Sequence, residues 1–338
     1  MDLTPKEIEA KNELRKQLKT LPEMNTEDDT TVVYEGVRGM EVQMIDYPYN
    51  PYKLIYEFAT ATWGPEDYPE NWPDTKPEHR FLVVRNAIKG KALPLGLEAI
   101  KFSFIVRKSS RSAFDQHARQ RMATFASQGV RDNSRLAAGF RMPDDIWNDP
   151  ELKSEVEIYL KEYKRLYKKI LKKGIGSFQT ARALMPMGMT HSYKFSVDYG
   201  ALQSYMAQRL SAVEQADTVA TAILTWNCIN SKFPLLANEL RPRCDKVGRC
   251  ICHQGDGSEL FGALFKGCGR FPGSESNYAT FNKSCSDYST LEKQLGMGIP
   301  YPDTEEWRNQ GKTVWKKYEN FSELEDIDKM MFVEDYRG

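Results

Sequence analysis

Alternating apolar and polar side chains mark several segments of this chain as strands. In residues 100–106, IKFSFIV, apolar side chains occupy every second position, which predicts a strand with one buried face. Residues 31–46, which contain TVVYEGV and MEVQMID, have similar strand character. Between these segments, residues 53–63, KLIYEFATATW, have the apolar spacing of a short buried helix. The pattern therefore predicts a chain that mixes strands and helices.

Longer segments have helical spacing, in which apolar side chains recur every three or four residues. Asp149 predicts the start of one helix, and Gly174 predicts its end. A second helix is predicted to open at Ser109 and to run off its end at Gly129, and a third is predicted from Tyr199 onward. The apolar positions of the first of these helices are Val156, Tyr159, Leu160, Tyr163, Leu166, Tyr167 and Ile170.

The two ends of the chain differ in composition from its middle. Residues 1–30 begin with a capping Thr4 and are predicted to form a charged helical extension followed by an acidic linker. Residues 64–80, rich in Pro, Glu and Asp, are predicted to form a loop, and residues 286–338 short helices with an acidic tail. We therefore expect a division into an N-terminal extension, a central domain and a cysteine-containing C-terminal extension, at residues 1–30, 31–227 and 228–338.

Composition narrows the classes of protein to which the chain can belong. Its 338 residues are 41% hydrophobic and 28% charged, which is enough for a well-buried core. Lys+Arg and Asp+Glu both number 47, so bulk charge does not favour nucleic-acid or membrane binding. We find no run of about 18 apolar residues and no apolar signal-peptide core, and we expect a cytoplasmic protein with reduced cysteines.

Arginines without acidic neighbours stand out in residues 116–131, QHARQRMATFASQGVR. Arg119, Arg121 and Arg131 lie among small and apolar residues. A guanidinium is a planar fork that suits phosphate and carboxylate, so these side chains are candidates for an anion pocket. The alternative is a solvated helix face on which the arginines have no specific role. On a continuous helix, Gln116 and Gln120 would point to the same side.

A second arginine-bearing region, residues 177–225, pairs with the first to form a family pattern. In the first region, Arg-Gln-Arg at 119–121 is followed by seven residues and then by Gly-Val-Arg at 129–131, with Gln116 three positions upstream. In the second, Ala-Arg-Ala-Leu-Met-Pro at 181–186 precedes Thr190, Arg209 and Gln-Ala-Asp at 215–217. Over residues 40–225 the chain thus resembles the flavin-dependent thymidylate synthases (the ThyX family), whose motifs are R-H-R, seven residues, S-x-R, then A-R-x-x-L-P and Ala-Gln-x-Glu.

The resemblance implies an α+β fold, a mixed sheet with packed helices, to which this chain adds the cysteine-rich extension. It implies that the protein binds a pyrimidine deoxynucleoside monophosphate, and dUMP is the first candidate. Arg119 and Arg209 would be catalytic: Arg119 would lie between nucleotide and flavin, and Arg209 would stabilise charge that develops on the pyrimidine ring. The nucleotide would be held by Gln116, Arg119, Gly129, Val130, Arg131, Arg182 and Arg209.

The resemblance also implies cofactors and a homotetramer with each site built from several subunits. FAD would carry the redox work, NADPH would be the reductant and methylenetetrahydrofolate the one-carbon donor. The flavin would contact Thr62, Glu98, Gln120, Arg121, Asp198 and Ser204. Departures from the family pattern gather on this flavin side: Gln120 replaces the His of R-H-R, and Ala126-Ser127 replaces Asn-Glu.

These departures favour a diverged member. The expected reaction is methylation of pyrimidine carbon 5, as in thymidylate synthases, or hydroxymethylation of that carbon. The alternatives are an enzyme that modifies dCMP and a flavin-free nucleotide-binding or structural protein on the same scaffold. A nucleic-acid-binding protein with a zinc module is a weaker alternative because the net charge is zero.

The remaining chemistry lies in the cysteines and histidines. Cys244, Cys250, Cys252 and Cys268 could hold a structural zinc, with His253 as a possible replacement ligand. The alternatives are free buried thiols and an iron–sulfur cluster. Elsewhere in the chain, the sequence predicts a core position for Cys228. His117 is predicted to be packed in the interior or to support a site residue, and His191 is predicted to be packed, with contact to a ligand as the alternative.

Overall fold

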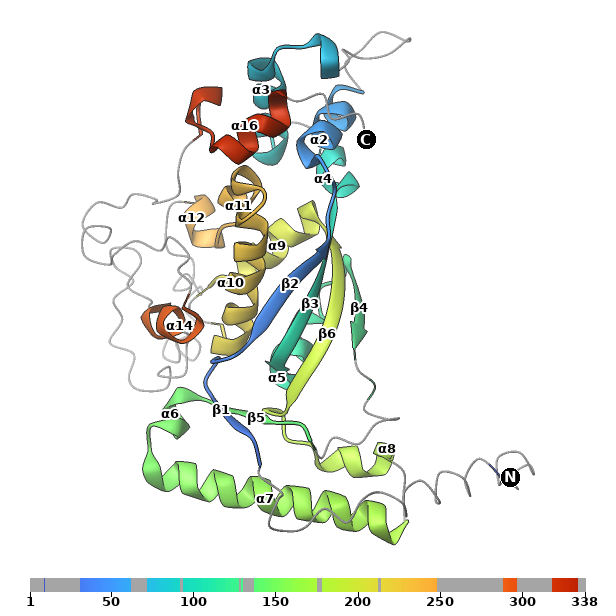
Figure 1. The fold of residues 1–338 in the computed structure, drawn as a ribbon, viewed down its shortest axis with the longest axis vertical. Coiled ribbons are helices and arrows are strands. Elements are labelled where there is room, and N and C mark those ends of the chain that lie inside the picture. The colour runs from blue at the N-terminus through green and yellow to red at the C-terminus, as the bar shows by residue number, and fades with distance from the viewer. Residues whose placement is uncertain are drawn as a thin grey trace, which may run out of the picture. The chain divides into compact units, whose positions relative to one another are not determined.

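A computed structural model describes residues 9, 31–61, 72–91, 94–127, 129, 137–174, 178–211, 214–247, 288–296 and 318–333 (Figure 1). The chain divides into two compact units. Unit 1 comprises Met1–Gly36, Ser110–Ser112 and Ser127–His191, and unit 2 comprises Val37–Ser109, Ala113–Ala126 and Ser192–Gly338. Both contain helices and strands, so the α+β class is confirmed.

A four-stranded sheet runs through unit 2 in the order β2-β3-β6-β4. β2 pairs antiparallel with β3, and Val42 lies opposite Val106. The alternation seen in residues 100–106 has its expected cause: Phe102, Phe104 and Val106 are fully buried, while their neighbours in sequence are partly exposed. The strands of this sheet are β2 (Glu41–Asp46), β3 (Lys101–Ser110), β4 (Ala123–Ser127) and β6 (Thr190–Asp198).

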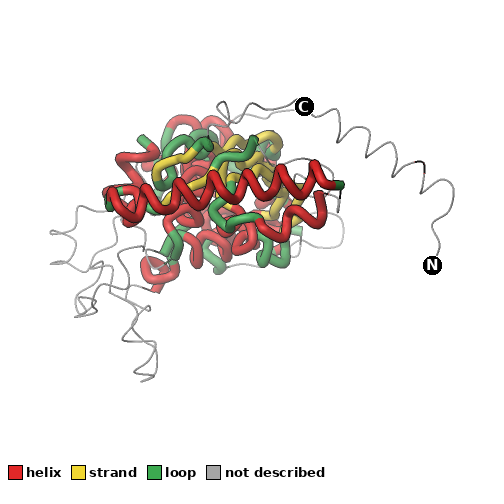
Figure 2. The backbone as a smooth tube through the Cα atoms, turned by 90° about the horizontal axis from the view of Figure 1, so that it is seen from below, coloured by secondary structure: helices red, strands yellow, loops and turns green. Residues whose placement is uncertain are grey.

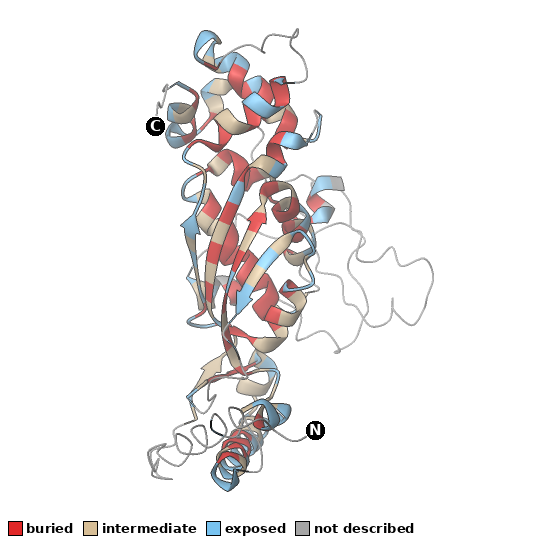
Figure 3. Ribbon diagram, turned by 90° about the vertical axis from the view of Figure 1, so that its right-hand side faces the viewer, coloured by how far each residue is buried: buried red, intermediate tan, exposed pale blue. Residues whose placement is uncertain are grey.

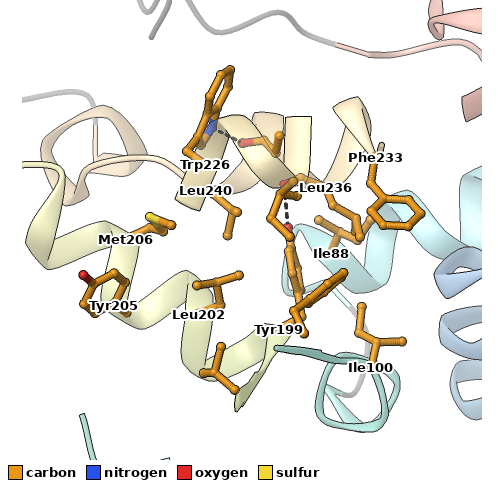
Figure 4. Packing of buried hydrophobic residues seen from close by; sticks show 14 of the residues in the cluster. Ile88, Ile100, Tyr199, Leu202, Tyr205, Met206, Trp226, Phe233, Leu236 and Leu240 are labelled. Atoms are coloured by element: carbon orange, nitrogen blue, oxygen red, sulfur yellow. Dashed lines mark hydrogen bonds between the residues drawn. The ribbon is translucent and has the colours of Figure 1, made fainter. Parts of the chain in front are cut away.

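Helices complete the core of unit 2. Figure 4 shows part of this core, where side chains of α9, α10 and α11 pack together and Tyr199 donates a hydrogen bond to the carbonyl of Leu236 at 2.8 Å. Figure 3 shows buried residues recurring along the strands and helices. The helical elements are α2 (Pro51–Thr60), η1 (Trp72–Asp74), α3 (Pro77–Ile88), α4 (Leu95–Ala99), α5 (Arg111–His117), α9 (Tyr199–Arg209), α10 (Ala216–Asn230), α11 (Pro234–Glu239), α12 (Arg243–Val247), α14 (Tyr288–Leu295), η3 (Phe321–Glu323) and α16 (Asp326–Val333).

The buried helix predicted from KLIYEFATATW is confirmed as α2. Its first turn is capped by the Asn50 side chain, which accepts from the Lys53 amide at 3.1 Å, and Pro51 occupies the first helical position. α4 approaches α2 so closely that a Cβ on Gly96 would lie 2.8 Å from the carbonyl oxygen of Ile55. A residue without a side chain is therefore required where these two helices meet.

Two predicted boundaries are wrong. The segment 64–80 was expected to be a loop, but Trp72–Asp74 form a 3-10 turn and α3 begins at Pro77. Trp72 is buried against the side chains of α2, and this tertiary burial outweighs the high Pro and acid content. The helix predicted from Tyr199 onward ends at Arg209, and a new helix begins at Ala216.

The last described segment of the chain packs on α2 and α3, and we call it the C-terminal clamp (residues 318–333). Phe332 is fully buried and its ring stacks on that of Tyr52 with centroids 4.8 Å apart. The Tyr52 hydroxyl donates to one carboxylate oxygen of Asp328, and the Leu235 amide donates to the other at 2.8 Å. Arg80 donates to the carbonyl of Phe332 at 2.6 Å. These contacts join helices that are far apart in sequence.

Unit 1 is built around a long helix. β1 (Val33–Glu35) pairs in parallel with β5 (Phe140–Met142), and the helical elements are α6 (Asp144–Trp147), α7 (Pro150–Lys173), α8 (Phe178–Ala181) and η2 (Arg182–Leu184). The predicted limits of α7 are confirmed, because Asp149 caps its first turn and Gly174 ends it with φ 62°. Figure 2 shows α7 as one uninterrupted helix. Four buried side chains of α7 form a cluster with Phe140 of β5; they are Leu160, Tyr163, Tyr167 and Leu171.

Several predictions fall outside the described residues or are not tested by them. The N-terminal helical extension and the thiols of Cys250, Cys252 and Cys268 lie outside; Cys244 belongs to α12. Within the described ranges, no three side chains of His, Cys, Asp or Glu come together as metal ligands. No helix among these residues has the length and apolar character to cross a membrane. The division at residues 30 and 227 stays a prediction.

Candidate functional site

The arginine-rich stretch has a different backbone from the one expected. The predicted continuous helix is wrong: α5 ends at His117, a turn follows, and residues 123–127 form β4. Tertiary contacts hold residues 123–127 in a strand, because β4 lies beside β6 in the sheet. The ring of Phe125 also lies against that of Phe195, with the centroids 6.1 Å apart. Gln116 and Gln120 therefore do not share a helix face.

The break in the helix separates the predicted site residues of this stretch. Arg119 and Arg121 lie exposed in the turn, and Gln120 donates from its amide to the carbonyl of Ala201 at 3.3 Å. Gly129 is exposed, and Val130 and Arg131 lie outside the described residues. The predicted phosphate role of Arg131 therefore remains a prediction.

Gln116 is held at both ends of its side-chain amide. Its amide nitrogen donates to Gln215 at 3.0 Å, and its amide oxygen accepts from the Thr218 hydroxyl at 3.2 Å. Gln215 immediately precedes α10 and Thr218 lies in its first turn, so the start of that helix fixes the glutamine. Bonds at both ends of the amide hold the Gln116 side chain in one position.

Arg209, at the end of α9, reaches the same place. Its Nη2 donates to the backbone carbonyl of Gln116 at 3.3 Å, and its Nη1 donates to the Glu214 carboxylate at 2.7 Å. The Arg209 and Glu214 side chains are only 12% and 19% exposed. The five residues Gln116, Arg209, Glu214, Gln215 and Thr218, which we call the site cluster, thus form one network of side chains from α5, α9 and the start of α10.

His117 lies buried next to the site cluster. Burial, and then the charge of Arg209, lower the pKa of His117 to about 3, so the ring is neutral at physiological pH. The ring stacks on Tyr205 with centroids 4.3 Å apart, and its Nδ1 lies 2.9 Å from the Tyr193 hydroxyl in a hydrogen bond. The predicted packed role of His117 is confirmed. A neutral ring here leaves Arg209 as the cation next to Gln116.

The residues predicted to contact the flavin lie in different environments. Asp198 is engaged as the cap of α9, accepting from the Ala201 amide at 2.8 Å, and its negative charge is unsuited to a pyrophosphate. Glu98 is an exposed acid, and the Ser204 hydroxyl donates to the carbonyl of Gly200 at 3.3 Å. Arg121 is exposed and positively charged, while Thr62 lies outside the described residues. Contact of these positions with a flavin stays a prediction.

Unit 1 holds other residues of the pattern. Arg182 opens η2 and is partly exposed, and Thr190 begins β6. His191 is buried, as its predicted packed position requires. In unit 2, Cys228 is half-buried against the core, and burial raises the pKa of its thiol. Whether Arg131, Arg182 and Gln116 meet around one phosphate stays a prediction.

Sequence reasoning missed Glu214 and Thr218. A signal existed for Glu214, because it stands directly before Gln215, where the Ala-Gln-x-Glu motif has alanine. Thr218 carried no such signal, since a threonine in the first turn of an apolar helix is common. Its role appears only when α5 and α10 are placed side by side.

Comparisons with known proteins identify relatives of this chain. The family described as thymidylate synthase complementing protein, Thy1, matches residues 43–235, more than half of the chain. The flavin-dependent thymidylate synthase of Pyrococcus abyssi is 26% identical over 223 residues, which are 62% of this chain and 89% of that protein. The enzyme of the same name from Nitratidesulfovibrio vulgaris is 20% identical over 244 residues, 68% of this chain and 95% of its own.

A solved structure has a similar fold. The UMP/dUMP methylase PolB from Streptomyces cacaoi, determined with bound 5-Br dUMP, matches with a TM-score of 0.50 at 13% identity. The match covers 62% of this chain and 96% of PolB. At this identity the likeness concerns the fold alone.

Proposed function

The chain belongs to the Thy1 family, thymidylate synthase complementing protein, and we propose that it transfers a one-carbon unit to carbon 5 of a pyrimidine deoxynucleoside monophosphate. The observation that carries the proposal is the bond from Arg209 to the backbone of Gln116, which unites two separate motifs of the family pattern. Relatives of the chain are named as flavin-dependent thymidylate synthases, and the resemblance suggests dUMP as the first nucleotide to test.

The roles proposed for the chain's own residues follow from charge and attachment. Arg209 would face the pyrimidine ring and stabilise negative charge that develops on its oxygens. Gln116, fixed by Gln215 and Thr218, would offer its backbone and amide to the nucleotide. Arg119, exposed in the turn after α5, is free of regular secondary structure and would approach the bound ligand from the solvent side. Arg131 and Arg182 are carried forward as predicted phosphate ligands.

The cofactors are proposed from family membership. FAD would supply the redox chemistry, NADPH the reducing electrons, and methylenetetrahydrofolate the carbon unit; the product would carry a methyl or a hydroxymethyl group. Asp198 and Gln120, both predicted to contact the flavin, are engaged in hydrogen bonds within the chain. We also propose a homotetramer, a cytoplasmic location and a zinc ion bound by the cysteines of the extension.

A direct assay tests the proposal. Purified protein is incubated with dUMP or dCMP, methylenetetrahydrofolate, FAD and NADPH, and the nucleotide product is identified by mass. A gain that corresponds to a methyl or hydroxymethyl group is expected, and it should be abolished in Arg209→Ala. Visible absorbance of the protein distinguishes a flavoprotein from a flavin-free binding protein. The proposal fails if no pyrimidine deoxynucleotide shifts the unfolding temperature and no product forms.

A further inference from the structure

The long helix α7 of unit 1 carries apolar side chains outside its buried face. The buried side chains of the helix pack with Phe140 of β5. Four further apolar side chains lie outside that cluster and are between 37% and 64% exposed. We call these four the α7 stripe; they are Leu152, Ile158, Tyr159 and Leu166.

The spacing of the α7 stripe gathers it on one side of the helix. Leu152, Tyr159 and Leu166 recur at every seventh residue, and Ile158 adjoins Tyr159. Because an α-helix has 3.6 residues per turn, positions seven apart lie nearly above one another. Single exposed apolar residues are ordinary on a protein surface, whereas a strip of them along a helix is typical of a helix that packs on another element. The α7 stripe is therefore a candidate contact surface.

Charged side chains that border the α7 stripe change sign along the helix. Glu151 and Glu155 lie near its N-terminus, Lys169 and Lys173 lie near its C-terminus, and all four are exposed. By helical spacing they flank the stripe, since Glu155 precedes Tyr159 by one turn and Lys169 follows the last apolar residue of the stripe by one turn. This order of charges also suits the helix dipole, but the dipole does not account for the apolar residues between them.

A second copy of the chain fits both ends of the helix if its own α7 runs antiparallel. Oligomers of identical chains are commonly built on a two-fold axis, which brings the same surface of both copies together. With the axis beside Glu162, Glu151 lies opposite Lys173, because the two are equidistant from Glu162. Glu155 lies opposite Lys169 for the same reason. Each acidic end then faces a basic end, whereas a parallel pair would place like charges together.

The same axis brings apolar residues of the two copies together. Ile158 and Leu166 are also equidistant from Glu162, so each meets the other across the axis. Glu162 itself lies at the axis, and its charge is balanced by Arg165, 2.5 Å away on the same helix. Apolar and charged positions thus agree on one antiparallel arrangement.

We propose that α7 is a docking surface for a second copy of this chain, with the two helices antiparallel and stripe packed against stripe. The contact goes beyond the one-carbon transfer and does not rest on it. It assigns to the proposed homotetramer one specific interface, whose charged ends determine the direction in which the copies pair.

Charge reversal tests both the contact and its direction. The molar mass of the full-length protein is measured by light scattering after size-exclusion chromatography, over a series of concentrations. One variant combines Glu151→Lys with Glu155→Lys, and another combines Lys169→Glu with Lys173→Glu. Each places like charges opposite each other, so we expect the dissociation constant of the contact to rise at least about 10-fold. The variant with all four changes again places opposite charges across the axis and should recover the wild-type mass, although its charges oppose the helix dipole.

Two further samples keep the result interpretable. The combination of Lys161→Glu with Lys172→Glu reverses two exposed lysines that lie off the stripe by helical spacing, and it should leave the mass unchanged. If the variant with all four changes does not fold by circular dichroism, the two double variants are mixed instead. One of them is positive at all four reversed positions and the other is negative, so the mixture should recover the wild-type mass.

The outcomes decide the contact separately from the reaction. A wild type that is monomeric at every concentration overturns the proposal, and so does a wild-type dissociation constant in both double variants. Failure of the four-fold variant, or of the mixture used in its place, to recover the mass overturns the antiparallel arrangement. Absence of a nucleotide product in the assay of the proposed function leaves the contact supported if the masses change as expected.

Discussion

Unit 2 buries ionisable side chains in two regions that use burial differently, His117 beside the site cluster and Asp328 in the C-terminal clamp. Burial lowers the pKa of His117 to about 3 and raises that of Asp328 to about 7, because a low-dielectric surrounding penalises the charged form of either group. The histidine is thereby kept neutral, and the aspartic acid becomes half-protonated near physiological pH. One physical cause thus gives two opposite dependences on pH.

The two regions also differ in what their hydrogen bonds connect. In the clamp, polar groups bond largely to backbone atoms, and Phe332 is enclosed by the rings of Tyr52, Trp72 and Phe81. In the site cluster, side chains bond mainly to other side chains, and Arg209 and Glu214 retain some exposure. A ligand can replace partners in the second arrangement, whereas exchange in the first would break the fold. We therefore expect the clamp to act in stability, and the site cluster remains the candidate site.

Removal of the clamp's central ring should give the largest effect. Phe332→Ala deletes a fully buried aromatic ring, and such truncations cost about 3–5 kcal/mol of the free energy of unfolding. Urea unfolding followed by circular dichroism measures the loss. Val333→Ala, at an exposed position of the same helix, is the matched control and should change little. Equal effects of the two changes would show that the clamp does not contribute to the stability of the unit.

The opposite pKa shifts should next be visible as opposite pH slopes. A depressed histidine pKa stabilises the fold above pH 6.5, and this contribution is lost as the pH falls toward 3. A raised aspartate pKa stabilises the fold below pH 3.8, and this contribution is lost as the pH rises toward 7. Between about pH 4 and 6.5 the two contributions oppose each other, each changing by roughly 1.4 kcal/mol per pH unit.

Single substitutions should expose these slopes one at a time. Relative to the wild type, Asp328→Asn should lose stability as the pH is lowered from 6.5 to 4.5, and His117→Phe should lose stability as it is raised over the same range. Each difference should reach roughly 3 kcal/mol, measured by urea unfolding at fixed temperature. Parallel curves for the two variants would contradict the pKa assignments.

A smaller effect is expected where the cluster fixes Gln116. Thr218→Val removes the hydroxyl that donates to the Gln116 amide and preserves the shape of the side chain. We expect about 1 kcal/mol of lost stability and a similar loss in nucleotide binding, or roughly 5-fold in Kd. Thr225→Val is the control, since its buried hydroxyl bonds only to the helix backbone at Thr221. If both changes weaken nucleotide binding equally, the bond from Thr218 to Gln116 does not contribute specifically to that binding.

The smallest effect should come from the exposed ion pair of α7. Glu162 and Arg165 lie 2.5 Å apart, but both are about half exposed, so water screens their attraction. Glu162→Gln should leave thermal unfolding and nucleotide binding at wild-type values. A marked loss of nucleotide binding in this variant would mean that the proposed site extends to α7.

Much of the fold could be predicted from local pattern. Alternation in residues 100–106 located β3, the capping Asp149 and the terminal Gly174 bounded α7, and apolar spacing located α2. The arginine-rich stretch was harder, because residues 123–127 are held in a strand by pairing with β6, a partner far away in sequence. Its local composition suits a helix as well as a strand, so the period of its side chains could not decide.

The residues of the family pattern were recognisable in sequence alone, because motifs depend on residue type and spacing. Sequence was enough to place the chain in the Thy1 family and to select Gln116 and Arg209 as candidates. The partners of these side chains were not recognisable, since Glu214 and Thr218 join them only when α5, α9 and α10 pack together. The pKa values of His117 and Asp328 likewise depend on burial, a property of the packed chain that residue type alone does not contain.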